Sequence, residues 1–376
     1  MLLAGASLLM RSVLNMSAAP LGFNPDHVMV MSTTLPGQHY SGVTDKLAFY
    51  DRLSRNLNAI PGVEASAIAT YMPPYGSGNY EMQIEGGART KRQDVGQNLV
   101  SADYFGVLRI PLRRGRMFSR QDGPNSTPVA IVNETLAREY FPGADPIGKR
   151  VRTIGFTEGH WVTIVGVAAT EKHPELMHEM SWREQAALYR PIQQDPPGYF
   201  SVAVRASGDR FDAASAIERA VARTDKEVPV GKISAMHTLL GAYLKYPRFR
   251  AIVLNQFAGF ALLLAALGLN GLLAQYVSRR TREIGLRMAV GARTRDVVRL
   301  VAMQAGKPVL AGLLIGTALT FGLTRYLTSL LFGVAPIDPL TTIMAPVALI
   351  TVAAVAMAKP AFDAASVDPG AALRHE

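Results

Sequence analysis

The stretch "RRTREIGLRMAVGA", residues 279–292, decides how this chain is organised. It contains five charged residues, yet it directly follows an uncharged run, 251–278, that is long enough to cross a bilayer as a helix. A helix would also place its apolar residues on two opposite sides. The surrounding sequence must therefore explain both its position beside the apolar run and its second apolar side.

The composition limits the class of protein. The chain has 376 residues, no cysteine, a formal net charge of +10 and 49% hydrophobic residues. This apolar content favours membrane spans, and the lack of cysteine excludes disulfides and thiolate metal or redox sites. A basic balance suits either nucleic acid or anionic lipid, so the position of the charges must decide between them.

Two further uncharged runs, 308–324 and 339–358, follow in the C-terminal third. The second of the three runs is short and needs its apolar neighbours, which gives expected spans near 251–278, 304–327 and 339–358. Buried core helices are the alternative, but three such runs so close together weigh against it.

The basic residues predict the orientation of these spans. Residues 279–307 contain eight Lys and Arg residues against two acidic ones, whereas the next loop carries only Asp338. By the positive-inside rule, residues 279–307 and the tail from Lys359 face the cytoplasm. The large region before Ala251 then lies outside.

The first ten residues are apolar and are followed by Arg11. They are too few to span a bilayer, and a signal peptide would carry its charge before the apolar part. An interfacial helix is one interpretation. We favour the outer end of an incomplete transmembrane helix, with Arg11 marking its exit to the outside.

Residues 24–245 have the pattern of one α+β region. Strands are expected within 27–36, 63–72, 161–169 and 200–206, and helices within 47–60, 133–141 and 209–225. Asn133 and Asp209 are the expected caps of the last two helices. Strands and helices do not alternate regularly, so a doubly wound parallel sheet is not expected.

The predicted architecture is therefore an α+β extracytoplasmic domain inserted between a first transmembrane helix and a three-helix all-α membrane domain. Residues 1–23 form the partial first helix and its exit, and residues 24–245 form the outer domain. Residues 246–376 form the membrane domain, which contains a cytoplasmic helix at 279–292.

One local pattern, "GADPIGKR" at 143–150, is similar to a phosphate-binding loop. Arg150 stands where that loop needs a hydroxyl group for magnesium, and a helix precedes the pattern while a strand follows it. This order is the reverse of the one required, so we expect a turn and no ATP binding.

A second pattern gathers two histidines and three glutamates: Glu171, His173, Glu175, His178 and Glu179. A metal site is the alternative, but Pro174 prevents one helix from presenting both imidazoles. A solvated polar loop is the favoured interpretation, and no catalytic constellation is evident elsewhere.

A third pattern concentrates four arginines: Arg113, Arg114, Arg116 and Arg120. A nucleic-acid patch is one alternative. The predicted topology places these residues outside the cytoplasm, which favours a solvated face or a surface near anionic headgroups.

The helical arrangement of 277–292 explains the opening stretch. One stripe contains Val277, Thr281, Ile284, Met288 and Ala292. Leu286 and Val290 lie on the opposite side. Between the two sides, Glu283 is spaced to pair with Arg287 and with Arg279. One stripe suits packing against a membrane, and a second apolar side rimmed by charge suits a protein partner. A positive-inside loop with incidental apolar residues is an equal alternative.

Several motifs resemble one family in their order along the chain: "VAIVNETLAREYFPGADPIGKRV", "WVTIVGVAA", "ALYRPIQ", "RTREIGLRMAVGA", "LLFGVAPIDPLT" and "VDPGAALRHE". From about residue 2 to residue 376, the chain resembles a MacB-like extracytoplasmic core domain followed by an FtsX-like ABC transporter permease domain. The resemblance is closest to the C-terminal half of large bacterial permeases in which this unit is duplicated.

Three features depart from that family. The first span is short and no first copy of the unit precedes it, which suggests the second half of a longer permease. The sequence "PAFDA" at 360–364 replaces a usual Pro-Ala-Arg-Arg-Ala, which puts a basic contact there in doubt. Asn270 replaces a usual aromatic residue and places an amide inside the membrane, where we expect it to face another helix.

The resemblance implies mechanotransmission: a separate cytoplasmic ABC ATPase dimer moves the helix at 279–292, and the spans pass this movement to the outer domain. The residues implied in the ATPase contact are Arg282, Glu283, Gly285, Leu286, Arg287, Val290 and Gly291. Leu286 and Val290 would be apolar anchors, and the charged residues would supply complementarity. The two glycines would allow close approach and end the helix.

The implied role is that of a multi-pass permease in a bacterial inner membrane, exporting a small molecule, peptide or lipoprotein. The implied partners are the ATPase dimer, a second permease copy or homodimer, a periplasmic adaptor and membrane lipids. Neither nucleic acid nor a cofactor is expected, nor is any catalytic or metal-binding residue. The alternatives are a non-transporting transmembrane regulator of a periplasmic enzyme, and a membrane-bound enzyme.

Overall fold

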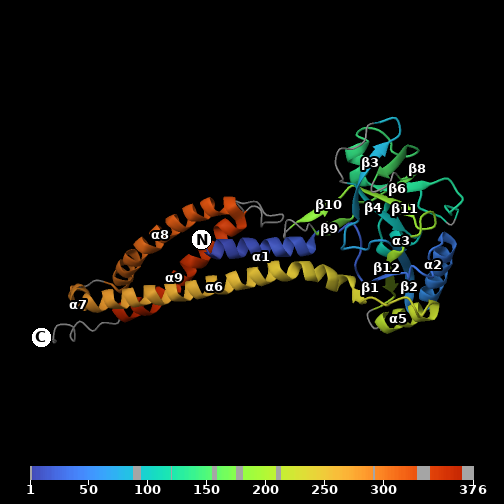
Figure 1. Ribbon diagram of the computed structural model, residues 1–376. Helices are drawn as coiled ribbons and strands as arrows, with labels where there is room; N and C mark the ends of the chain where they lie inside the picture. Colours follow the sequence, from blue (N-terminus) through green and yellow to red (C-terminus); the bar gives the residue numbers. More distant parts are fainter. Residues whose placement is uncertain are drawn as a thin grey trace. The chain divides into compact units, whose positions relative to one another are not determined.

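The computed structural model of the protein describes residues 2–87, 95–119, 121–154, 159–174, 181–208, 213–290, 293–327 and 339–365. The chain divides into two compact units (Figure 1). Ala19–Leu244 is called here the sheet unit, and Met1–Ala18 together with Lys245–Glu376 the helical unit.

The sheet unit combines short helices with many strands. Its strands are β1 (Val28–Thr34), β2 (Val63–Ala69), β3 (Gly78–Ile84), β4 (Val95–Val100), β5 (Leu112–Gly115), β6 (Val129–Asn133), β7 (Arg150–Ile154), β8 (Val162–Ala168), β9 (Lys172–Pro174), β10 (Trp182–Glu184), β11 (Ala187–Pro191), β12 (Tyr199–Ala206) and β13 (Ser234–Ala235). Its helices are α2 (Val43–Asn58), α3 (Tyr104–Leu108), α4 (Glu134–Tyr140) and α5 (Ala213–Thr224), together with the start of α6 (Met236–Arg279).

The main sheet closes on itself in one part. Strands pair in the order β11-β6-β8-β7-β3-β4, and β11 also pairs with β4 in parallel, so these strands form a ring. From β4 the sheet continues through β2, β12, β1 and β13, while β5 pairs with β8. The parallel pairs β6–β8 and β11–β4 occur among antiparallel ones, which gives a mixed sheet rather than a doubly wound one.

The open part of the sheet is buried on both faces, because alternate residues of a strand point to opposite sides. In β1, Val28 and Val30 join a core with α3, whereas Met31 joins a second core with α2 and α5. In the second core, Phe200 of β12 meets Tyr50 of α2 edge to face, with ring centroids 5.1 Å apart. Figure 1 shows α2 and α5 beside these strands.

The elements predicted from periodicity are present. The expected strands are β1, β2, β8 and β12, and the expected helices are α2, α4 and α5. Asn133 caps α4 as predicted, since its Oδ1 accepts a hydrogen bond from the Leu136 N–H at 2.9 Å. Asp209, the expected cap of α5, lies outside the described residues.

The helical unit contains α1 (Leu2–Ala18), the rest of α6, α7 (Thr281–Ala289), α8 (Thr294–Leu327) and α9 (Pro339–Ala365). Within the described residues, three helical segments are long and apolar enough to cross a membrane: Met236–Arg279, Arg295–Gly322 and Ile343–Pro360. The three expected spans fall in α6, α8 and α9.

The first helix continues beyond Arg11, so the exit from the membrane expected at this residue stays a prediction. The helix continues to Ala18, because arginine is a good helix former and no proline occurs before Pro20. The Ser17 hydroxyl also donates to the Val13 carbonyl at 2.8 Å within the same helix.

Asn270 of α6 faces another helix, as predicted. Its Nδ2 donates to the backbone carbonyl of Ala356 in α9 at 3.0 Å. Pro360, four residues after Ala356, has no N–H to offer that carbonyl. The asparagine amide thus supplies the donor that the proline removes.

Candidate coupling site

The segment between α6 and α8 is divided in a way that the sequence did not predict. Instead of one helix through 279–292, α6 ends at Arg279 and α7 runs from Thr281 to Ala289. The Thr281 hydroxyl lies 3.0 Å from the carbonyls of Val277 and Ser278, which closes the end of α6. The Arg280 carbonyl then accepts from the Ile284 N–H at 2.9 Å and begins α7.

One side of α7 is buried in the helical unit. Ile284 is only 1% exposed and packs with Leu273 and Val277 of α6 and with Val297 and Val301 of α8. This cluster fixes which way α7 faces, and it confirms the predicted burial of Val277 and Ile284.

The opposite side of α7 is exposed and apolar. Leu286 is 55% exposed, and Val290, which directly follows α7, is 85% exposed. The Val290 N–H bonds to the Leu286 carbonyl at 3.1 Å, so the two side chains stay one helical turn apart. Two large apolar side chains in such register are the arrangement that a partner groove needs.

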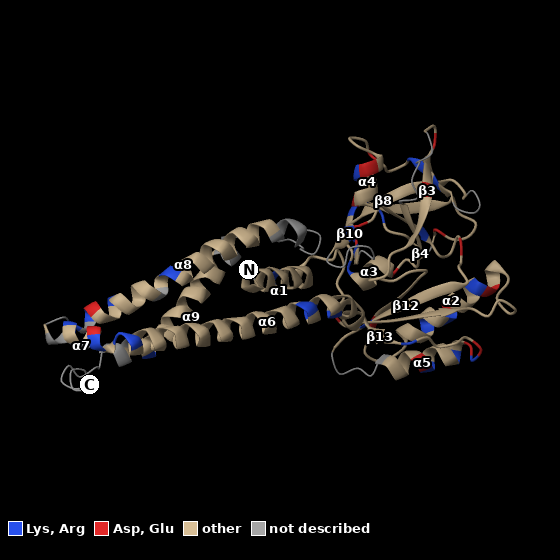
Figure 2. Cartoon of the chain, turned by 60° about the vertical axis from the view of Figure 1, so that its left-hand side comes forward, with Lys and Arg blue, Asp and Glu red and all other residues tan. Residues whose placement is uncertain are grey.

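Charged residues of both signs lie on α7 near this apolar pair (Figure 2). Glu283 pairs with Arg287 at 2.7 Å, as the spacing predicted, and with Arg280 at 3.7 Å in place of the expected Arg279. These side chains are about half exposed, so each pair contributes only about 0.3–0.5 kcal/mol. Their arrangement suits orientation of a partner more than stabilisation of α7.

Arg280 is a member of this site that the sequence analysis missed. Its guanidinium lies over the Tyr276 ring, 4.9 Å from the centroid, and donates to the Tyr276 hydroxyl at 3.0 Å. The spacing of four residues to Tyr276 and three to Glu283 was the available signal.

The other predicted members of the site are placed as follows. Arg282 is exposed, Gly285 lies within α7, and Gly291 lies outside the described residues. The structure thus brings Arg282, Glu283, Leu286, Arg287 and Val290 to one short segment with Ile284 behind them.

The phosphate-loop look-alike at 143–150 is a turn, as expected. It follows α4 and precedes β7, and Gly148 has a φ of +80°, a conformation that favours glycine. Lys149 is exposed, and its N–H bonds to the Pro146 carbonyl at 3.1 Å.

The expected solvated loop at 171–179 is wrong for Glu171. This residue is 2% exposed and accepts hydrogen bonds from the hydroxyls of Tyr104 and Tyr189, each at 3.0 Å. Burial raises the pKa of Glu171 to about 7, although both tyrosine bonds act to lower it. The two tyrosines lie 67 and 18 residues away in the sequence, so no local pattern could have revealed this contact.

His173, two residues further on, is also not a solvated side chain. Its Nδ1 is enclosed without a hydrogen-bond partner among the described residues, and burial lowers the pKa of the imidazole to about 4. Glu175, His178 and Glu179 lie outside the described residues. In the part of the chain that the structure describes, no three His, Cys, Asp or Glu residues are grouped to hold a metal.

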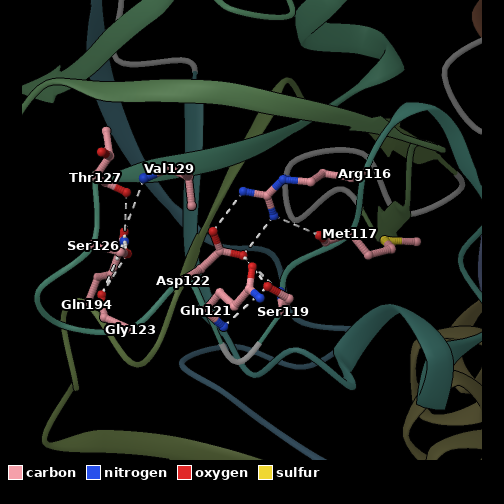
Figure 3. A network of polar contacts seen from close by, with 10 residues as sticks. All are labelled: Arg116, Met117, Ser119, Gln121, Asp122, Gly123, Ser126, Thr127, Val129 and Gln194. Carbon is pink, nitrogen blue, oxygen red and sulfur yellow. Dashed lines mark hydrogen bonds and ion pairs between the residues drawn. The ribbon is translucent and has the colours of Figure 1, made fainter.

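The arginine-rich stretch is paired with carboxylates. Arg113 lies 3.2 Å from Glu134, and Arg114 lies 3.6 Å from Asp145. Arg116 binds both oxygens of the buried Asp122 at 2.8 Å (Figure 3). The fourth member, Arg120, lies outside the described residues. These partners argue against a phosphate-binding patch.

The network in Figure 3 holds one loop of the sheet unit in place. The Ser119 N–H donates to Asp122 at 2.8 Å, and the Arg116 guanidinium lowers the pKa of that carboxyl. On the other side of the loop, Gln194 accepts from the Val129 N–H at 3.1 Å and donates to the Ser126 hydroxyl at 3.0 Å. These hydrogen bonds give the residues of this network a structural role in the sheet unit.

Two family models and a solved structure are similar to this chain. A MacB-like periplasmic core domain matches residues 1–221, and an FtsX-like permease C-terminal domain matches residues 255–369. The periplasmic region of MacB from Actinobacillus actinomycetemcomitans aligns at 15% identity with a TM-score of 0.40, covering 60% of this chain and 95% of that one.

Relatives of known name are similar to this chain over only part of their own length. The chain is 27% identical to the pyoverdine export ATP-binding/permease protein PvdT of Pseudomonas putida, covering 83% of this chain and 47% of that protein. It is also 27% identical to the probable export ATP-binding/permease protein MacB of Pseudomonas entomophila, covering 61% and 34%. The chain thus spans about half, or less, of these relatives.

Because the first match covers more than half of the chain and the second follows it in the order the motifs require, the family is settled. The chain belongs to the family of MacB-like periplasmic core domain proteins and carries an FtsX-like permease domain in its C-terminal third.

Proposed function

We propose that this chain is the permease subunit of an ABC-type export system that works by mechanotransmission. A separate cytoplasmic ATPase dimer pushes α7, and α6 carries the movement to the periplasmic sheet unit. The observation that carries the proposal is the apolar pair Leu286 and Val290, exposed on α7 opposite the buried Ile284.

The energetics favour a partner for this pair. Burying a leucine or valine side chain stabilises a contact by about 1.5–3 kcal/mol. Neither side chain has this stabilisation while it is exposed. The charged residues beside them on α7 would align the partner before contact.

The path from α7 to the sheet unit supports the relay. α6 ends at Arg279 beside α7, and it begins with Met236 and Leu240 in a core of the sheet unit. Met236 is 0% and Leu240 is 7% exposed, so the start of this helix is held by packing.

The proposed topology is multi-pass in the bacterial inner membrane, with α6, α8 and α9 as spans. The basic excess of residues 279–307 supports a cytoplasmic α7, and the sheet unit then lies in the periplasm. A second permease copy and a periplasmic adaptor would complete the system. Relatives named for pyoverdine export support a small molecule or peptide as cargo.

The decisive experiment is co-purification with the ATPase after Leu286→Asp. Losing an apolar anchor and desolvating a carboxylate would weaken association by about 2–4 kcal/mol, a factor of tens to hundreds. The variant should still insert normally. Val43→Asp is a matched control, because Val43 is 53% exposed on α2 in the sheet unit.

Ile284→Asp should fail differently. It buries a charge in the helical unit and should lower the amount of inserted protein itself. If Leu286→Asp retains the ATPase as well as Val43→Asp does, the exposed pair is incidental and the proposal is wrong.

A further inference from the structure

The first part of α6 within the helical unit, Lys245–Ile252, presents aromatic and basic side chains on its exposed surface. Tyr246 is 73% exposed and Phe249 is 66% exposed. Lys245, Arg248 and Arg250 are exposed around them. On the other side of the same helix, Leu244, Pro247 and Ala251 are buried. The helix is therefore two-sided here, and its outward face is large and apolar but rimmed with positive charge.

Neither α1 nor the part of α6 around this face contains an acidic residue. The sequence has no Asp or Glu between Glu227 and Glu283, and α1 has none either. Helix α1 runs antiparallel to α6, since Ser17 accepts from Arg248 at 3.3 Å and Ala6 accepts from Asn255 at 3.4 Å.

Arg11 lies on α1 between those two contact points. Figure 2 shows basic residues on α6 at this end and again near α7, with none between them. The positive-inside rule accounts for the basic residues at the α7 end only. The basic residues at the other end of α6 need a separate reason.

The position of this face relative to the apolar run supplies that reason. The uncharged run 251–278 begins directly after Arg250, which puts Tyr246 and Phe249 where hydrocarbon meets water. Aromatic rings settle at this level of a bilayer, and long basic side chains reach from it to phosphate groups. The guanidinium group of an arginine can also bind two oxygens of one phosphate group at once.

We propose that Lys245, Arg248 and Arg250, flanked by Tyr246 and Phe249, bind the phosphate headgroups of anionic phospholipids at the membrane surface next to the sheet unit. The proposal rests on the proposed function in one respect, that α6 spans the membrane. The bound headgroups hold the base of α6 at a fixed depth in that leaflet.

The test uses the full chain, purified in neutral detergent with phosphatidylcholine and titrated with phosphatidylglycerol. Lipid binding is measured by native mass spectrometry and by the shift in thermal unfolding. Each basic residue near an anionic surface is worth about a fivefold change in binding, so K245Q/R248Q/R250Q should bind phosphatidylglycerol about a hundredfold more weakly. Replacement of both arginines by lysine, R248K/R250K, should keep most of the binding.

A charge-matched control removes three exposed basic residues of the sheet unit: R219Q/R223Q/K226Q. This variant should bind phosphatidylglycerol like the wild type. Equal binding by the K245Q/R248Q/R250Q variant and the wild type would overturn the proposal. So would equal stabilisation by inorganic phosphate, since a free-anion site needs no lipid. No ATPase is present, so either result leaves the α7 contact to its own test.

Discussion

The hydrogen bond between Asn270 and Ala356 makes a prediction that can be worked through in detail. The carbonyl of Ala356 has no donor in its own helix, because Pro360 lacks an N–H, and the Asn270 amide donates to it at 3.0 Å. Asn270→Ala removes that donor. Pro360→Ala restores a backbone N–H that can bond to the same carbonyl. The two substitutions should therefore interact.

The magnitude follows from the setting of the bond. Hydrogen bonds between membrane helices contribute about 0.6 kcal/mol on average and up to about 1.7 kcal/mol. A carbonyl left without a donor in apolar surroundings adds a cost of about 1–3 kcal/mol, partly offset by removal of the amide. Asn270→Ala should thus lower the free energy of unfolding by about 1–2 kcal/mol. In the Pro360→Ala background the same change should cost close to nothing.

The assay is reversible unfolding of the purified chain in mixed micelles by increasing dodecyl sulfate, applied to all four members of the double-mutant cycle. Thr351→Ala is the control, because the Thr351 hydroxyl donates to Val347 within α9 at 2.8 Å and shares no partner with Asn270. Its effect should be additive with Pro360→Ala. Additive effects of Asn270→Ala and Pro360→Ala would refute the reasoning.

Three further predictions concern pH, topology and nucleotide. Glu171 has its pKa raised from 4.5 to about 7, so its contribution to stability is full below pH 4.5 and is lost as pH rises through 7, whereas His173, lowered from 6.5 to about 4, loses its contribution as pH falls. The free energy of unfolding, followed by the signal of Trp161 and Trp182, should be nearly independent of pH in the wild type, because these two effects oppose each other. It should rise with pH in Glu171→Gln and should fall by roughly 3 kcal/mol as pH rises in His173→Gln. Parallel profiles in the three proteins would contradict this. Cysteine at Ser207 should react with an impermeant thiol reagent on intact spheroplasts and cysteine at Arg295 should not, and the reverse result would invert the proposed topology. Lys149→Ala should leave nucleotide binding by the purified chain at background, and binding that this substitution abolishes would revive the phosphate-loop interpretation.

Local patterns were sufficient for much of the fold. Alternation predicted β1 and β12, and the cap at Asn133 follows from one side chain and the N–H three residues later. The helical arrangement predicted that Ile284 is buried and Leu286 exposed, which the structure confirms. Each of these depends on residues close together in the sequence.

Other features depend on contacts that no local pattern contains. At the break at Arg280, the Thr281 hydroxyl bonds back to the last carbonyls of α6. The spacing of these residues also occurs in an unbroken helix, so the sequence did not reveal the break. The burial of Glu171 requires two tyrosines from distant strands and helices. The proposed role of Leu286 depends on the surface of a partner, and no pattern within residues 279–292 describes that surface.

The closed ring of strands also bears on how the sheet unit comes to be folded. Its last strand in chain order, β11, pairs Ala187 with Gly96 of β4 and Leu188 with Val132 of β6. Until β11 has been synthesised, β4 and β6 keep unpaired edges, and unpaired edges are where chains aggregate. Closure between such distant segments is slow, on the scale of about milliseconds to seconds. We therefore expect an emerging chain to remain sensitive to proteases and dependent on chaperones until β11 has left the translocation machinery.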